Sequence, residues 1–189
     1  MTYFFMISIG VDPSINSTGI CVSDGKKYKY YIITSKMTKK MAAFRHKYIQ
    51  LIPYEKGETK GLEYTEKESV KTKNFACICD AIKSIIRKHK PDIIKMEGVS
   101  YGSTGSAALV DLSGLNFMLR QLFLMEKVPF IIVSPSQNKK FAVANGSADK
   151  DVMVDAWKRM DSNIVDVSDI KIDDLADSFF LACFEQSPN

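Results

Sequence analysis

The sequence of 189 residues predicts an α/β protein built around one central sheet. Strongly apolar runs at 4–11, 93–96 and 128–133 are typical of strands that are buried on both faces. An amphipathic helix pattern at 74–88 separates the first run from the second, and a longer helix pattern at 107–126 separates the second from the third. Strands that alternate with helices in this way favour an α/β arrangement.

The first part of the chain predicts a meander of three strands. A turn-rich loop at 12–19 follows the first strand, and the dipeptide Asp24-Gly25 is a strong hairpin signal between the second and third. The three expected strands cover residues 4–11, 19–22 and 28–33, and a helix is expected near 37–44.

The second half predicts helices around two further strands, which gives five strands in all. Pro91 ends the helix at 74–88, and the next strand carries Glu97. The helix at 107–126 is apolar nearly all round, so it either lies centrally in the core or forms part of a dimer interface. The remaining helices are a short one after Ser134-Pro135-Ser136, one at 149–160 and one at 173–185.

The stretch 45–73 is the least regular part of the chain. It is rich in Lys, Glu, Tyr and Gly, and a run at 48–52 has the composition of a hairpin arm. We interpret residues 1–189 as a single domain with an inserted arm or loop at about 45–73, which either is solvated or touches a polyanionic substrate.

The composition indicates an intracellular protein. The four cysteines lie inside apolar patterns and are expected to be reduced, and the start of the chain lacks a basic signal-peptide region. No apolar run is judged to approach membrane-spanning length. The net charge of +4 is compatible with a nucleic-acid partner, and no Walker-type phosphate loop or nucleophilic triad is present in the sequence.

Four carboxylates stand at the edges of apolar runs in three separate places. Asp12 ends the first strand, Glu97 ends the fourth, and Asp174 and Asp177 share one face of the last helix. Acids at strand ends lie at the rim of the sheet, where α/β proteins build their sites. Gathered there, the four would form an all-oxygen cage suited to Mg²⁺ or Mn²⁺, which points to phosphodiester chemistry.

The motifs around these acids resemble the RuvC-type Holliday junction resolvases of the RNase H-like superfamily, and especially their phage and poxvirus forms. The resemblance runs from residue 7 to about residue 184, except for roughly 45–73. Four motifs in order carry it: Ile9-Gly10-Val11-Asp12-Pro13-Ser14 with Thr18-Gly19; Ile93-Ile94-Lys95-Met96-Glu97; Ser134-Pro135-Ser136-Gln137-Asn138-Lys139-Lys140 with Asn145-Gly146-Ser147-Ala148-Asp149-Lys150; and Asp173-Asp174-Leu175-Ala176-Asp177-Ser178.

The resemblance implies an RNase H-like fold, a mixed five-stranded sheet flanked by helices, in a homodimer that cuts Holliday junctions. It implies that Asp12, Glu97, Asp174 and Asp177 are catalytic and bind two Mg²⁺ ions, for which Mn²⁺ would substitute. It also implies roles in recombination and repair for a phage- or virus-encoded enzyme in the host cytoplasm, with no membrane or nucleotide cofactor. The expected DNA contacts are Lys139, Lys150, Lys140 and Tyr101, although Lys140 could instead serve solubility and Tyr101 could instead pack its loop.

Three departures from the cellular bacterial form bear on specificity. The stretch after the third strand is longer, the aromatic after Glu97 is out of clear register at Tyr101, and Asp173 adds an acid beside the pair. These departures argue against a strict specificity for four-way junctions and for a fixed cleavage sequence, and the resemblance to phage-type members implies a broader range of branched DNA substrates. Two alternatives are another RNase H-like nuclease, such as one that cuts RNA–DNA hybrids, and a branched-DNA-binding protein without activity.

Overall fold

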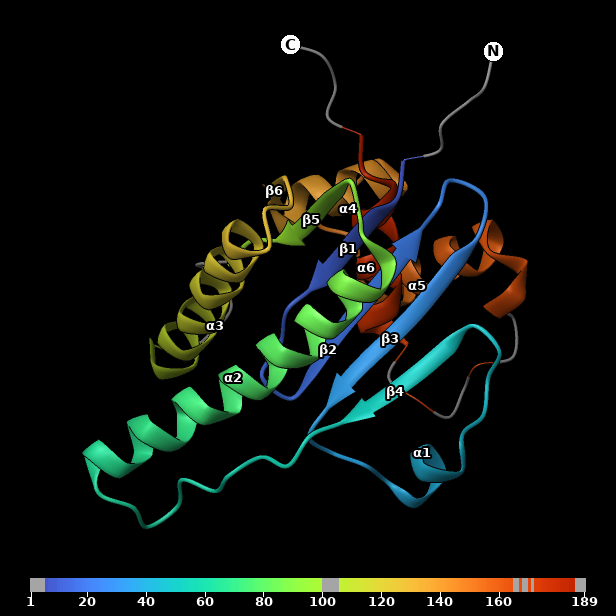
Figure 1. The fold of residues 1–189 in the computed structure, drawn as a ribbon. Coiled ribbons are helices and arrows are strands. Elements are labelled where there is room, and N and C mark those ends of the chain that lie inside the picture. The colour runs from blue at the N-terminus through green and yellow to red at the C-terminus, as the bar shows by residue number, and fades with distance from the viewer. Residues whose placement is uncertain (1–5, 100–105, 165–166, 168–169, 171, 186–189) are drawn as a thin grey trace.

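A six-stranded sheet organises the part of the chain that the computed structural model describes, which is residues 6–99, 106–164, 167, 170 and 172–185 (Figure 1). β1 lies at its centre and pairs antiparallel with β2 and parallel with β5. The strand order is β4-β3-β2-β1-β5-β6, with bounds β1 Ser8–Asp12, β2 Ser17–Ser23, β3 Tyr28–Thr34, β4 Ile49–Pro53, β5 Ile93–Glu97 and β6 Phe130–Val133. The predicted α/β class and mixed sheet are confirmed.

The sheet has one strand more than the five expected. β4 lies inside the stretch interpreted as an arm or loop, and it pairs parallel with β3, with Leu51 opposite Ile32. A parallel partner needs a crossover connection. Residues 35–48, which include the short helix α1 (Lys39–Ala43), provide it. The sequence signal was ambiguous because β4 is an edge strand with only one fully buried residue, Ile49.

Helices cover both faces of the sheet. α2 (Tyr64–His89) and α3 (Ser106–Met125) lie on one face, in the same apolar core as Tyr31 and Ile33 of β3. Tyr30 and Ile32 point to the opposite face, as alternation along a strand requires. That face is covered by α5 (Lys150–Met160) and α6 (Asp173–Cys183), with α4 (Pro135–Val143) and a 3₁₀ turn at Ser162–Ile164 beside them.

α2 begins ten residues earlier than the expected start at residue 74. Glu63 and Glu66 form a capping box in which each side chain accepts from the other residue's backbone N–H. The first turns project beyond the core and carry mainly polar side chains. Periodicity alone therefore missed this part of the helix, whereas the spacing of Glu63 and Glu66 marks its start.

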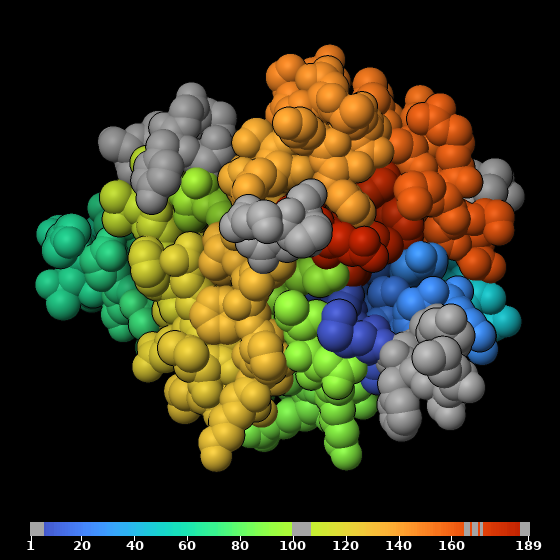
Figure 2. Space-filling view, turned by 90° about the horizontal axis from the view of Figure 1, so that it is seen from above, coloured from blue at the N-terminus to red at the C-terminus, as the bar shows by residue number. Residues whose placement is uncertain are grey.

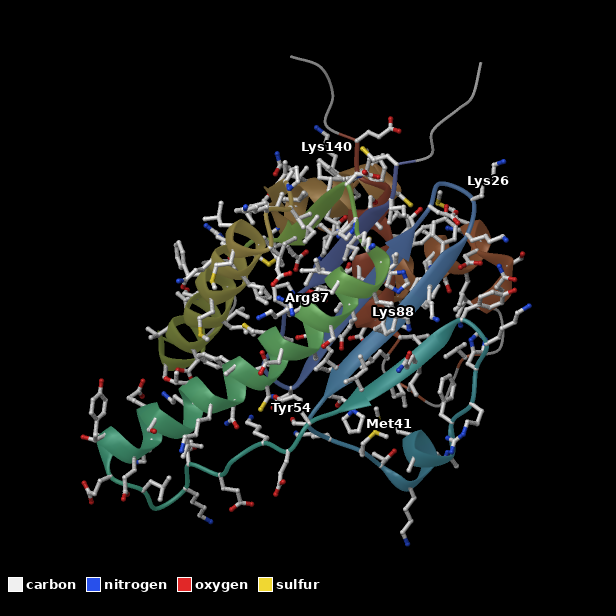
Figure 3. All side chains as sticks on the ribbon, viewed as in Figure 1. Lys26, Met41, Tyr54, Arg87, Lys88 and Lys140 are labelled. Atoms are coloured by element: carbon white, nitrogen blue, oxygen red, sulfur yellow. The ribbon has the colours of Figure 1, made fainter. Side chains whose placement is uncertain are left out.

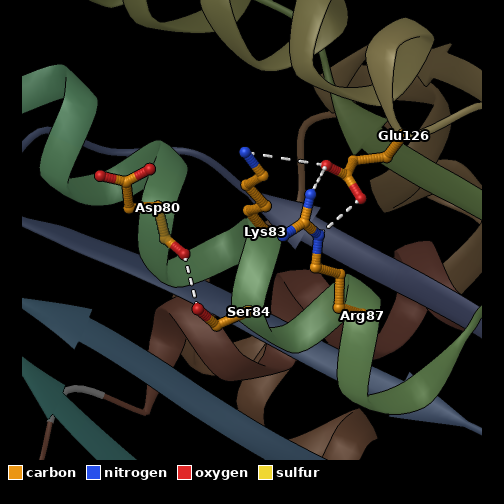
Figure 4. A network of polar contacts seen from close by, with 5 residues as sticks. All are labelled: Asp80, Lys83, Ser84, Arg87 and Glu126. Atoms are coloured by element: carbon orange, nitrogen blue, oxygen red, sulfur yellow. Dashed lines mark hydrogen bonds and ion pairs between the residues drawn. The ribbon is translucent and has the colours of Figure 1, made fainter.

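The C-terminal ends of α2 and α3 are joined by one acidic side chain. Glu126 accepts hydrogen bonds from Nε and Nη2 of Arg87 at 3.0 and 2.9 Å, and Lys83 lies 3.9 Å from the same carboxylate (Figure 4). The Arg87 guanidinium is the main reason why the pKa of Glu126 lies below its ordinary value. These contacts fix the two helices relative to each other on one face of the sheet.

α3 exposes an apolar stripe. Val110, Phe117 and Leu124 are 69%, 64% and 68% exposed, and their spacing of seven residues places them on one side of the helix. Figure 2 shows the C-terminal part of α3, in yellow, at the surface. By length and composition Ala107–Met125 could also cross a membrane, contrary to the expectation that no run approaches that length.

Candidate active site

The four predicted acids line one cleft of about 560 Å³. β1 and β5 are parallel neighbours, so Asp12 and Glu97 at their C-terminal ends reach the same rim of the sheet. Asp174 and Asp177 enter the cleft from the first turns of α6, one turn apart on one face. The fold therefore gathers carboxylates that lie up to 165 residues apart along the chain.

Two glycines allow α6 to lie directly on the strands. A Cβ at Gly19 of β2 would stand 2.1 Å from the carbonyl oxygen of Asp174, and a Cβ at Gly10 of β1 would stand 2.0 Å from that of Ser178. Both distances are far below van der Waals contact, so only glycine permits this approach. The motif glycines thereby set the depth at which Asp174 and Asp177 enter the cleft.

Polar contacts hold both ends of α6. The Ser17 hydroxyl donates to the Asp174 carboxylate at 2.5 Å. At the other end, Nζ of the buried Lys95 donates to the carbonyls of Ala182 at 3.0 Å and Phe184 at 2.7 Å. Lys95 thus satisfies carbonyls that would otherwise be orphaned where α6 ends.

Asn116 is a site residue that the sequence interpretation missed. Its Nδ2 donates to the Glu97 backbone carbonyl at 3.0 Å, and its Oδ1 accepts from Arg120 Nε at 2.9 Å. Its side chain is 1% exposed and lines the cleft. The available signal was an amide in the middle of an otherwise apolar helix, where a polar group has to find partners.

We expect Asn116→Ala to lower the free energy of unfolding by about 1–3 kcal/mol, because the Glu97 carbonyl would lose a buried donor. Denaturant titration measures this change. Gln121→Ala is the matched control, since Gln121 is exposed on the same helix and its loss should cost within about 0.5 kcal/mol. Equal stabilities of the two variants would contradict the positioning role.

The expected DNA-contact residues fall into three groups. Lys139 and Lys150 line the cleft, and Lys150 Nζ lies 2.5 Å from Asp173 Oδ2. Lys140 is exposed and does not appear among the described cleft residues; Figure 3 shows it near the top of the molecule. Tyr101 lies outside the described residues.

The cleft favours neutral acids when no cation balances them. Burial, followed by the charges of Glu97, Asp177 and Asp174, raises the pKa of Asp12 well above its ordinary value. Burial and the charge of Asp177 raise the pKa of Glu97 to about 7. Burial also raises the pKa of Asp177 to about 6, although Lys150 and Lys139 act in the opposite direction.

No protein-family model and no curated protein matches the sequence. Solved structures do match. The chain resembles Thermus thermophilus RuvC in complex with a Holliday junction substrate, with a TM-score of 0.61 and 12% identity over 94% of this chain and 90% of that one. The chain has the RuvC fold.

Two further structures agree. A second structure of Thermus thermophilus RuvC gives a TM-score of 0.55 at 15% identity, covering 94% of this chain and 91% of that one. The yeast mitochondrial Holliday junction resolvase Ydc2 gives 0.56 at 19% identity, covering 96% and 78%. The RNase H-like architecture inferred from the motifs is thus confirmed as a fold.

The donors in the cleft of this RuvC-like chain suit a hard divalent cation. All four acidic side chains supply oxygen, which Mg²⁺ and Mn²⁺ prefer. Burial is the main cause of the raised pKa values of Asp12, Glu97 and Asp177, and neighbouring carboxylates add to it, so a bound cation would stabilise the charged forms. As the side chains are placed, no three Asp, Glu, His or Cys groups of the described chain converge on one ion position.

Proposed function

We propose that the protein is a metal-dependent, structure-selective endonuclease that hydrolyses phosphodiester bonds in Holliday junctions and other branched DNA. The cleft that unites Asp12, Glu97, Asp174 and Asp177 on a RuvC fold is the observation that carries this proposal. A structurally similar protein, RuvC of Thermus thermophilus, has been solved in complex with a Holliday junction substrate. RuvC-type proteins are generally metal-dependent.

Each acid has a distinct place in the proposed chemistry. Asp12, at the end of the central strand, would contribute to both metal sites, Glu97 and Asp174 to one each, and Asp177 would complete the second. Two bound Mg²⁺ ions would stabilise charge on both the attacking and the leaving oxygen of the scissile phosphate. Ser17 keeps the Asp174 carboxylate oriented by its hydrogen bond.

Lys139 and Lys150 supply the positive charge that the DNA requires. Both line the cleft, so they can bind phosphates next to the scissile bond as point charges. Lys150 also forms an ion pair with Asp173, an acid that does not line the cleft. These contacts orient the backbone, while the acid cluster acts on the bond to be cut.

Cleavage of a four-way junction, a flap and an RNA–DNA hybrid in the presence of Mg²⁺ tests the proposal. We expect the junction and the flap to be cut and the hybrid duplex to remain intact. Preferential cutting of the hybrid would identify a different RNase H-like nuclease. Binding of the junction without cleavage in Mg²⁺ or Mn²⁺ would identify a DNA-binding protein without activity.

The apolar stripe of α3 supports the proposed homodimer. Val110, Phe117 and Leu124 leave more than three fifths of each side chain exposed in the single chain. A second copy would cover the stripe symmetrically and provide two cleavage sites for two strands of one junction. The stripe thereby accounts for the apolar composition that also suits a membrane span.

We expect Phe117→Glu to convert the dimer into a folded monomer, because it places a charge at the centre of the stripe. Light scattering at micromolar concentration measures the mass. Tyr64→Glu is the matched control, since Tyr64 is 76% exposed at the start of α2. A wild-type mass of one chain, or a dimer that withstands Phe117→Glu, would contradict the proposed interface.

A further inference from the structure

The excess positive charge of the protein is concentrated at the outer edge of the sheet. Residues 25–54 contain eight of the 26 Lys and Arg residues and none of the 22 Asp and Glu residues. This stretch contains β3, α1 and β4, and Figure 3 shows Met41 of α1 beside β4 at that edge. The rest of the chain has the other 18 basic residues against all 22 acidic ones.

Two hollows mark this edge. The first has a volume of about 350 Å³, and its charged and aromatic lining residues are Lys29, Phe44, Arg45, His46 and Lys47. The second has a volume of about 400 Å³, and its charged lining residues are Lys36, Lys56, Glu58 and Lys60. Lys36 lines the second hollow and its neighbour Met37 lines the first, so the two hollows adjoin.

The second hollow also adjoins the acid cleft. The loop after Asp12 separates them, with Ser14 lining the cleft and Asn16 lining the hollow. Nζ of Lys56 donates to Asn16 Oδ1 at 2.7 Å, and the Asn16 carbonyl accepts from the Ser35 N–H at 3.2 Å. The cleft and the two hollows therefore follow one another from the centre of the sheet to its edge.

We propose that Lys36, Lys29 and Lys47, called here the outer track, bind the phosphate backbone of one DNA arm that leaves the cleft. This inference rests on the proposed function, because it takes the substrate to be branched DNA. These lysines have no acidic neighbours in the sequence, so their charge is available to DNA phosphates. When such lysines bind, the DNA releases the counterions that its phosphates had held. Lys47 lies 5.1 Å from the Tyr48 ring centroid, which holds the ammonium group beside the strand.

Sheet dimensions give the reach of the outer track. Asp12 is level with Ile32 of β3, two strand spacings away, and Lys29 lies three residues from Ile32 along β3, which gives a straight distance of about 14 Å. Leu51 of β4 is one spacing further out, and Lys47 lies four residues before it, which gives about 20 Å. Duplex DNA rises about 3.4 Å per base pair. An arm therefore has to extend roughly four to five base pairs from the cleft to meet Lys29 and Lys36 and roughly six to meet Lys47.

The test is the binding of four-way junctions by Asp12→Asn protein with and without Lys29→Gln, Lys36→Gln and Lys47→Gln. One junction has arms of fifteen base pairs, and the other has arms of three base pairs closed by hairpin loops. On the long arms we expect the triple substitution to weaken binding about tenfold or more. The slope of log K against log salt should fall by about 2 to 3. On the short arms affinity should change less than about twofold.

The matched control carries Lys73→Gln, Lys90→Gln and Lys127→Gln, which remove the same charge from exposed positions outside the track. Two results would contradict binding by the outer track: an equal loss of junction affinity in the two triple variants, or a loss of affinity on short arms as large as on long arms. Weaker binding to anionic phosphatidylserine vesicles with unchanged DNA affinity would also overturn it.

Two further measurements keep the outcome interpretable. Lys36→Gln with Lys47→Gln, at two exposed positions, should reproduce most of the loss if the triple variant is unstable. Cleavage of the short-armed junction by protein with Asp12 intact tests the proposed function alone. If that junction stays uncut, but the salt dependence of long-arm binding still falls in the triple variant, the proposed nuclease function is contradicted. The outer track is then still supported as a DNA-binding surface.

Discussion

Asp12→Asn is expected to reduce junction cleavage by on the order of 10³-fold or more and to leave junction affinity within a few-fold. Asp12 ends the central strand, and the other three acids of the cleft all act on its pKa, so it is the common neighbour of the cluster. Loss of a single preorganised electrostatic group costs about 10²–10³ in rate. The loss here should be larger, because Asp12 would serve both metal ions.

Single-turnover cleavage in Mg²⁺ and binding by fluorescence anisotropy separate the two effects. Asp173→Asn is the matched control, since it is the adjacent acid that pairs with Lys150 rather than lining the described cleft. We expect that variant to retain most of its activity. Cleavage by Asp12→Asn at the wild-type rate would remove Asp12 from the site.

Gly19→Ala is expected to abolish most cleavage and to lower the free energy of unfolding by about 1–3 kcal/mol, the range for overpacking. The added methyl group would stand 2.1 Å from the Asp174 carbonyl oxygen, so the first turn of α6 has to move away from β2. That movement carries Asp174 away from Asp12 and breaks its hydrogen bond with Ser17.

Denaturant titration and single-turnover cleavage measure the two losses. Gly114→Ala in α3 is the control, because its methyl group would meet only the Phe75 ring at 3.4 Å. Alanine in a helix is favoured over glycine by up to about 1 kcal/mol, so this variant should match or exceed the wild-type stability. A Gly19→Ala protein with unchanged activity would show that the close approach does not position the acids.

Much of the fold and the grouping of the acids could be predicted because the relevant signals are local. Asp12 and Glu97 end strongly apolar runs. A carboxylate at the end of a buried strand lies at the rim of the sheet, where it can reach solvent or a ligand. Asp174 and Asp177 share a helix face by spacing alone. Burial of the strands fixes where each acid lies, so these local patterns were enough to predict the cluster.

Features that depend on partners distant in sequence escaped prediction. β4 is a strand because β3 offers it an edge to pair with, which its own half-exposed residues do not reveal. Ser17 and Asn116 contribute through Asp174 and Glu97, which lie 157 and 19 residues away. Ser and Asn are common on surfaces, so their burial at the cleft becomes evident only from the assembled chain.

The packing of α6 on β1 and β2 has a consequence for the order in which the protein matures. β1 is synthesised early and α6 late. The core on this face of the sheet forms only when both are present, because Phe179 and Phe180 of α6 pack in the same cluster as Cys21 and Ile32. Contacts of such long range form slowly, because a large loop has to close first. A nascent chain whose α6 is still inside the ribosome has Asp12 but not yet Asp174 at the cleft. The proposed DNA cleavage would therefore have to wait until α6 has docked on β1 and β2.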